Sequence, residues 1–451
     1  MTTTTHLLNR RRFLPLFITQ LFNAFNDNLY KNAMVLFVVY QVYNSPSSEG
    51  TFASVASGLF ILPFFLLSAL AGQLADMRDK AAIIRTVKAC EIILMLIGAV
   101  GLYLAWTGFL VEEIAIPLML LALLLTGVQS TFLGPIKYAI LPQHLKKEEV
   151  LAGTGLVEAG TYIAILAGTI LAGWIDVQYA MVAVVLTAIA GYFVSRQVPD
   201  APPQGLIKEK LDWNIFRASK NLIQETMHNR EVFYAIMAIS FFWTIGAVLF
   251  IQFIPLAKNV IMAEPAVASL FLVIFSVGVA IGSISINMLL KGKVSAKYSP
   301  VSVLAMGLFV VAFYFVTRLW AADQPTELLG VWEFIAWPMA AFLLLCLLGI
   351  AVAGGMFVVP LYAFLTTRVA PEQAARTIAA NNIVNSGAMV AGSLAAMLLN
   401  VIGISIPEQL LLSAGMCLIS AWLGHRLYKA EIAAASKDSP TSGNQSEASF
   451  N

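Results

Sequence analysis

Long apolar runs separated by short polar segments occupy most of the chain. A helix needs about 20 apolar residues to cross a hydrocarbon core of about 30 Å, and most of the runs reach that length. Because the runs are continuous rather than alternating, they favour membrane-spanning helices over a β-barrel. The pattern predicts an all-α membrane protein with twelve transmembrane helices, at about residues 13–42, 52–75, 83–107, 114–141, 150–175, 178–196, 232–256, 266–290, 299–320, 333–364, 373–402 and 407–427.

The longest polar segment lies between the sixth and seventh predicted spans and divides the chain into two six-helix halves. It begins with Pro and Gly residues and then takes on a helix-like pattern. The last residues are rich in Ser, Ala and Gly and hold few large apolar groups, a composition typical of disorder. The predicted organisation is an N-terminal half at 1–196, a linker at 197–231, a C-terminal half at 232–428 and a disordered tail at 429–451.

Composition supports a membrane location and argues against several other classes. Charged residues make up 12% of the chain and hydrophobic residues 59%, with a mean hydropathy of +0.82. An ordinary soluble domain is about one-quarter charged. The net charge of +2 gives no reason to expect nucleic acid as a partner. The Cys and His residues are scattered without metal-type or catalytic spacing, so we predict no enzyme, no metal site and no cofactor.

Lys and Arg residues gather on one side of the predicted spans and indicate the orientation of the chain. Since basic loops stay in the cytoplasm, both termini, the linker and the tail are predicted to be cytoplasmic. The other side carries mostly acids, such as Glu49, with Lys258 and Arg318 as exceptions. The basic side holds Arg10 to Arg12, Arg78, Lys80, Arg85, Lys88, Lys146, Lys147, the linker, Lys291, Lys293, Lys297, Arg368, Arg376, Arg426 and Lys429.

The two predicted halves also share a weak sequence similarity. Gly134-Pro135 followed by LVEAG at 156–160 corresponds to Val359-Pro360 followed by IVNSG at 383–387. Such a parallel repeat predicts a transporter whose substrate binds between the halves, near the midplane of the membrane. Chance resemblance is the alternative, because the matching stretches are short.

The stretch FNAFNDNLYKNA, residues 22–33, places charge inside the first predicted span. A charged side chain at mid-membrane costs about 2.5–3.5 kcal/mol on insertion scales, so such residues usually face a cavity or a partner. Lys31 follows Asp27 at the i,i+4 spacing that lets two helical side chains meet. We predict that Asn23, Asp27 and Lys31 face a substrate cavity, with simple neutralisation of Asp27 by Lys31 as the alternative.

A second pair of charges lies in the fourth and fifth predicted spans. Lys137 and Glu158 are expected at similar depths on neighbouring antiparallel helices, where their side chains can pair. Gly134-Pro135, which ends two residues before Lys137, is expected to kink the fourth helix, a geometry tolerated where helices line a cavity. The pair is a candidate substrate contact, and a purely structural ion pair is the alternative.

Neutral polar residues take the place of charges in the second half. Asparagines are costly in lipid but can also join helices, so packing is an equally weighted alternative to substrate binding. We select Asn382 and Asn385 as candidate substrate contacts. The full set is Trp243, Thr244, Gln252, Asn381, Asn382, Asn385 and Ser386.

The segment GQLADMRDKAAIIRTVK, residues 72–88, joins the second and third predicted spans and resembles the signature loop of the major facilitator superfamily. That signature reads roughly G-x-L-x-D-[RK]-x-G-[RK]-[RK], and Asp79 stands here in place of its second glycine. The resemblance implies the major facilitator fold and a loop that gates the inward/outward transition. A solvated turn with basic orientation residues is the alternative. The implied gating residues are Gly72, Asp76, Arg78, Lys80 and Arg85.

Five stretches together resemble a narrower group, the bacterial lysophospholipid transporters and the transporter part of their acyltransferase/acyl-ACP synthetase fusions. The resemblance covers about residues 13–427, and it is carried by FNAFNDNLYKNA, GPIKYAILPQ, GLVEAGTYIAILAG, GGMFVVPLYAFL and NNIVNSGAMVAG. It implies a flippase that moves lysophospholipids from the outer to the inner leaflet of the bacterial inner membrane for reacylation by a separate acyltransferase/acyl-ACP synthetase. Asp27, Lys137 and Glu158 become the implied head-group contacts.

Two departures from that group concern the charges. The seventh predicted span ends in AVLFIQFIP, with Phe250 and Gln252 where the resemblance implies a basic residue, and Lys31 is an addition. We expect a monomer in contact with membrane lipids. The alternatives are a transporter of another small organic solute, for efflux or uptake, and a non-transporting membrane sensor.

Overall fold

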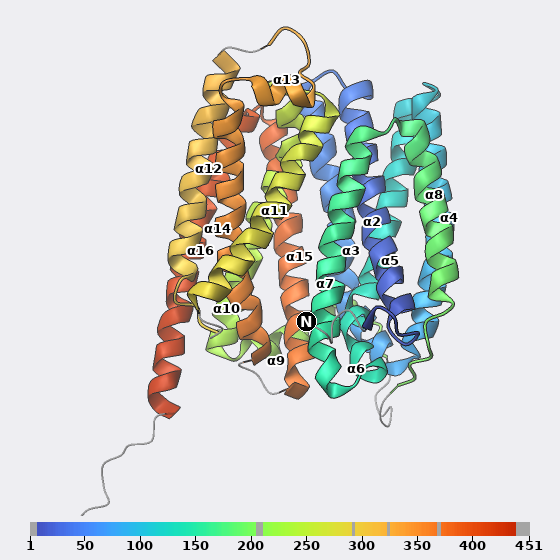
Figure 1. The fold of residues 1–451 in the computed structure, drawn as a ribbon, viewed down its shortest axis with the longest axis vertical. Helices are drawn as coiled ribbons and strands as arrows, with labels where there is room; N and C mark the ends of the chain where they lie inside the picture. Colours follow the sequence, from blue (N-terminus) through green and yellow to red (C-terminus); the bar gives the residue numbers. More distant parts are fainter. Residues whose placement is uncertain (1–6, 204–210, 291–293, 323–324, 368–370, 439–451) are drawn as a thin grey trace, which may run out of the picture.

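The computed structural model describes residues 7–203, 211–290, 294–322, 325–367 and 371–438 of the chain. Long helices run up and down through these residues and form one bundle (Figure 1). We call the end of the bundle that holds α13 in Figure 1 the upper end, and the end that holds α6 and α9 the lower end.

The N-terminal half comprises α2 to α8. Two helices in it carry a π-helical turn at their upper end, η1 after α2 and η2 before α5. The bounds are α2 Leu14–Phe37, η1 Val38–Val42, α3 Pro46–Met77, α4 Lys80–Trp106, η2 Val111–Ala115, α5 Ile116–Ala139, α6 Leu141–His144, α7 Lys147–Trp174 and α8 Val177–Ser195.

The linker and the C-terminal half follow as α9 to α16. The helix-like pattern predicted within the linker is the amphipathic helix α9. The bounds are α9 Ile215–Met227, α10 Arg230–Leu256, η3 Ala257–Ile261, α11 Pro265–Leu289, α12 Ser299–Ala322, α13 Val331–Ala336, α14 Ala340–Thr367, α15 Pro371–Val401 and α16 Ile406–Asp438.

The same helix pairs pack in each half. In the first half α2 lies against α7 and α8, and α3 lies against α5; in the second, α10 lies against α15 and α16, and α11 lies against α14. This correspondence between the helix pairs is what two similar halves would produce, and the division of the chain at the predicted boundaries stays a prediction. The halves meet where α3 contacts α15 and α10, and where α7 contacts α11.

The predicted number of spans is not confirmed in full. Within the described residues, 10 helices are long and apolar enough to cross a membrane. The long helices outside that set are α2 and α7. Within α7, the segment Ile163–Trp174 is a shorter apolar helix. In α2 the cause is chemical, because the polar residues of FNAFNDNLYKNA lower its hydropathy.

Two predicted spans end differently in the structure. The span at 333–364 is two helices, α13 and α14, because Trp337 precedes Pro338 and the residue before a proline is disfavoured in a helix. The span at 407–427 continues to Asp438, through an Ala-rich stretch of good helix formers. The rest of the predicted disordered tail, 439–451, lies outside the described residues.

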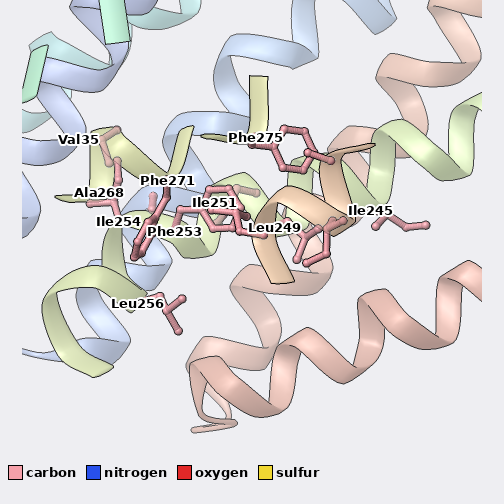
Figure 2. Close-up of a cluster of buried hydrophobic side chains, with 14 of the residues drawn as sticks. Val35, Ile245, Leu249, Ile251, Phe253, Ile254, Leu256, Ala268, Phe271 and Phe275 are labelled. Carbon is pink, nitrogen blue, oxygen red and sulfur yellow. The ribbon is translucent and has the colours of Figure 1, made fainter. Parts of the chain in front are cut away.

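Close helix contacts and apolar surfaces hold the bundle together. A Cβ atom on Gly168 of α7 would lie 2.5 Å from the backbone oxygen of Phe25 on α2, so only glycine lets these helices approach this closely. Figure 2 shows Val35 of α2 among apolar side chains of α10 and α11, including Ile254 and Ala268. Large apolar side chains such as Leu308 on α12 are exposed on the outer surface, as in helices that face lipid.

Candidate functional site

Asp27 lies inside the N-terminal half with only 6% of its surface exposed. Its Oδ2 atom accepts hydrogen bonds from Asn23 Nδ2, at 3.1 Å, and from the hydroxyl of Ser130 on α5. Its Oδ1 atom accepts no hydrogen bond from the part of the chain that the structure describes. Because buried polar atoms are nearly always bonded, this oxygen is suited to accept a hydrogen bond from a ligand.

A second carboxylate, that of Glu91 on α4, is fully buried in the same half. It forms an ion pair with Lys88, one turn earlier on the same helix, and accepts a hydrogen bond of 2.8 Å from Asn26 Nδ2. Gln129 Nε2 donates both to Glu91 Oε2, at 3.2 Å, and to Asn23 Oδ1, at 2.7 Å. Gln129 therefore links the two carboxylates into one network.

We call this set the N-half network. It comprises Asn23, Asn26, Asp27, Lys88, Glu91, Gln129 and Ser130. Five of these residues were not among the candidates from the sequence. Lys88 was assigned to the basic surface that orients the chain, and that assignment is wrong, because its side chain is fully buried. The available signal was the i,i+3 spacing of Lys88 and Glu91 within an apolar helix.

Lys31 does not contact Asp27 in the way its spacing suggests. Within the described residues there is no ion pair between them, and Asp27 is bonded instead to Asn23 and Ser130. The Lys31 ammonium lies 5.6 Å from the centre of the Phe60 ring on α3, within the range of a cation–π contact. Lys31 therefore lies one helical turn from Asp27 on α2 without forming a direct ion pair with the Asp27 carboxylate.

The predicted pair Lys137 and Glu158 is only partly visible. Lys137 lies in the last turn of α5, two residues after Pro135, and its backbone oxygen accepts a 3.4 Å hydrogen bond from Gln20 of α2. This contact brings the end of α5 to the helix that carries Asp27. The side chain of Glu158 lies outside the described part of the chain, so its pairing with Lys137 stays a prediction.

Among the described side chains, those bonded to Asn385 in the interior of the C-terminal half are polar and uncharged. The hydroxyl of Ser240 donates to Asn385 Oδ1 at 2.7 Å, and Asn385 Nδ2 donates to the hydroxyl of Tyr362 at 3.4 Å. Tyr362 also accepts a 2.7 Å bond from Trp243 Nε1. Asn385 is buried in this C-half network, whereas Asn382 is exposed.

The predicted gating loop, between α3 and α4, docks onto the start of the linker. Asp79 caps α4, because its Oδ1 accepts from Ala81 N at 2.8 Å, and it also accepts from Ala201 N at 3.2 Å. Arg85 donates to the Val198 backbone oxygen at 2.7 Å and pairs with Asp200 at 2.8 Å.

Asp79 therefore has a structural role at the position where a glycine was expected. Of the other predicted gating residues, Lys80 is buried and Arg78 is exposed, and Gly72 has open space where a Cβ would be. The side chain of Asp76 lies outside the described residues, and the gating role of the loop stays a prediction.

Comparison with known proteins places these features in a family. The model of the Major Facilitator Superfamily matches residues 16–393. A protein of Photorhabdus laumondii named Lysophospholipid transporter LplT is 24% identical over 361 residues, which cover 77% of this chain and 78% of that protein. A protein of the same name from Yersinia pestis (strain Pestoides F) is 25% identical over 368 residues, or 79% of each chain.

Solved structures show the same fold. A bacterial homologue of the iron transporter ferroportin, in an inward-facing state, superposes with a TM-score of 0.65 at 13% identity, over 93% of this chain and 98% of that one. A D-xylose-proton symporter superposes with a TM-score of 0.64 at 13% identity, over 92% and 96% of the two chains. At these identities the similarity concerns the fold alone.

Proposed function

Because the chain belongs to the Major Facilitator Superfamily and is a multi-pass membrane transporter, we propose that its substrates are lysophospholipids. In this proposal the two halves rock around a central site and flip the lipid from the outer to the inner leaflet of the bacterial inner membrane. Both termini are cytoplasmic, and a separate acyltransferase/acyl-ACP synthetase reacylates the product. The relatives named Lysophospholipid transporter LplT, which align over more than three-quarters of the chain, support this choice of substrate.

The observation that carries the proposal is the buried Asp27 carboxylate, one oxygen of which accepts no hydrogen bond from the described residues. A zwitterionic head group needs an anion for its ammonium and a cation for its phosphate. Asp27 supplies the anion, while Lys137, and Lys31 one turn from Asp27, supply the cations. Both signs of charge therefore occur within the N-terminal half, where water-poor surroundings strengthen their attraction for a ligand.

The remaining candidates take supporting roles in the proposal. Asn23 orients the Asp27 carboxylate through its 3.1 Å hydrogen bond, and Glu158 is a second possible partner for the ammonium. Asn382 and Asn385 contribute neutral contacts from the opposite half. The loop holding Gly72, Asp76, Arg78, Lys80 and Arg85 controls opening at the lower end.

Reconstitution into liposomes tests the proposal. Purified protein is expected to accelerate the movement of labelled lysophosphatidylethanolamine between leaflets relative to protein-free liposomes. A monoacylglycerol with the same chain, which has no phosphate or ammonium, is not expected to move faster. Lys137→Ala is expected to abolish the movement and Lys137→Arg to retain it, because arginine keeps the positive charge for the phosphate.

Two outcomes contradict different parts of the proposal. Wild-type protein that leaves the lysolipid in its original leaflet would refute the substrate and leave another small organic solute as the alternative. Unchanged movement in Lys137→Ala, at equal protein content, would refute the role of Lys137 while leaving the substrate in place.

A further inference from the structure

A buried carboxylate lies at the upper end of the bundle, between the two halves. Glu49, in the first turn of α3, is only 1% exposed. Its Oε1 atom pairs with Lys258 Nζ at 2.6 Å, and its Oε2 atom accepts a hydrogen bond from Asn259 Nδ2. Lys258 and Asn259 belong to η3, which continues α10 of the C-terminal half. Both carboxylate oxygens of one half are therefore bound by the other half.

Lys258 also binds the end of the first helix. Its ammonium donates to the backbone oxygens of Val39, in η1, and of Tyr43, directly after it. Carbonyl groups at a helix end have no partner within the helix, and a cation stabilises them. With the bond to Glu49, all three ammonium hydrogens are used. One side chain from the C-terminal half thus holds both α2 and α3 of the N-terminal half.

Further contacts close the same end. The hydroxyl of Tyr40 donates to the Ala263 backbone oxygen at 2.8 Å, and the hydroxyl of Ser47 donates to the Asn400 backbone oxygen at 3.0 Å. One helical turn below Val39, Val35 packs against apolar side chains of α10 and α11 (Figure 2). This apolar layer keeps water from the ion pair and strengthens its attraction.

We infer that Glu49, Lys258 and Asn259 form an inter-half latch that holds the upper end of the transporter closed and must open in each transport cycle. When the halves rock apart, the Glu49 and Lys258 side chains separate and both regain water. Substitution of one partner destabilises the closed state, because the other charge is then buried without a counter-charge. The latch therefore sets the balance between the closed and open states of this end.

This inference adds a gate at the end opposite the predicted gating loop. It rests on the alternating access contained in the proposed function, but it does not depend on the substrate. Arg318 and Glu408 provide a matched control, since they form a 3.1 Å ion pair within the C-terminal half and are 56% and 35% exposed. Their pairing crosses no boundary between moving parts, so its loss is not expected to open the upper end.

The test measures the distance between spin labels in liposomes without any lysophospholipid. The labels are placed at Ile114→Cys and Trp332→Cys, both exposed at the upper end on opposite halves, after replacement of Cys90, Cys346 and Cys417 by Ala. Glu49→Gln is expected to raise the ratio of long to short distances about tenfold. Asn259→Ala, which removes one hydrogen bond and no charge, is expected to raise it less, and Glu408→Gln is expected to leave it unchanged.

Unchanged distances in folded Glu49→Gln would overturn the latch, and so would an equal shift in Glu408→Gln. If Glu49→Gln does not fold, Asn259→Ala decides, and an unchanged distance distribution in that variant overturns the latch. The outcome is separable from the proposed function. If the variants change the label distances as expected but the wild-type protein moves no lysolipid, the proposed substrate alone is refuted. If the wild-type protein moves lysolipid but the variants leave the distances unchanged, the latch alone is refuted.

Discussion

The two halves have the same helix packing but opposite interior chemistry. The N-half network is built around two carboxylates and an ammonium, with Asp27, Glu91 and Lys88 all at least nine-tenths buried. The C-half network joins Ser240, Trp243, Tyr362 and Asn385 and contains no charge. Burying charge is expensive, so stability alone would not require a charged network in one half and an uncharged network in the other. We infer that the N-terminal half recognises the charged part of the substrate and the C-terminal half supplies a neutral wall.

Corresponding helices show where the difference arises. The first helix of the N-terminal half carries Asn23, Asn26 and Asp27, while the first helix of the C-terminal half carries Ser240 and Trp243. The third helix of the N-terminal half, α4, brings Lys88 and Glu91, whereas the buried polar side chains of α12 are hydroxyls, such as Thr317. The two halves thus share a fold, and their interiors differ in charge because a few buried positions hold different residues.

The largest expected effect comes from breaking the buried pair of the N-half network. Lys88→Met leaves Glu91 buried without its counter-charge, and we expect a loss of about 3–5 kcal/mol in the free energy of unfolding. The matched change in the other half, Ser240→Ala, removes one neutral hydrogen bond to Asn385 and is expected to cost about 1 kcal/mol. Thermal unfolding of the purified variants in detergent compares the two.

A double variant distinguishes lost charge balance from lost packing. Lys88→Met with Glu91→Gln removes both charges, while the glutamine oxygen still accepts the hydrogen bond from Asn26. We expect this variant to recover most of the lost thermal stability. A double variant no more stable than Lys88→Met would show that charge balance is not what the pair contributes, and similar costs for Lys88→Met and Ser240→Ala would remove the contrast between the halves.

The smallest expected effect concerns a charge at the lower rim. Glu149 lies at the start of α7, and its pKa is lowered from the ordinary 4.5 by a hydrogen bond from the Lys146 backbone N–H and by the Arg12 guanidinium at 2.7 Å. Because the folded pKa is below the unfolded one, the stabilisation is present above pH 4.5 and is lost as the pH falls below it. Glu149→Gln is expected to be slightly less stable than wild type at pH 7.

The measurement is the difference in unfolding temperature between wild type and Glu149→Gln from pH 7 down to about pH 3. The difference is expected to shrink as the wild-type carboxylate takes up its proton. A constant difference over that range would mean that Glu149 acts through packing rather than through charge. A small effect would fit the view that ion pairs with access to solvent, such as this partly exposed one, contribute little compared with the buried pair of Lys88 and Glu91.

Most of the fold could be predicted, because a membrane-spanning helix is recognised in a sequence as one long apolar run. The ends of the helices were harder to predict. Pro338 interrupts a helix although the sequence on both sides of it is apolar, and the Ala-rich stretch up to Asp438 continues a helix although it is not strongly apolar. In addition, the π-helix η3 extends the seventh span, which brings Lys258 and Asn259 to Glu49. Hydropathy does not reveal such extensions.

The candidate site could be predicted only where a charge stood out against apolar neighbours. Asp27 met that condition, and the structure places it in a buried network. Lys88 was misassigned because it lies near the end of its helix, where cations usually orient the chain. Its contacts, and those of Gln129 and Ser130, depend on how α2, α4 and α5 cross, which the sequence alone does not determine.

The most direct test of the central claim compares one substitution in each interior. Labelled lysophosphatidylethanolamine is followed between leaflets in liposomes that contain equal amounts of folded wild type, Asp27→Asn or Asn385→Ala. We predict that Asp27→Asn abolishes the movement, because it removes the negative charge that binds the ammonium, while Asn385→Ala retains a substantial fraction of it. Equal rates in the two variants, or greater loss in Asn385→Ala, would contradict recognition of the head group by the N-terminal half.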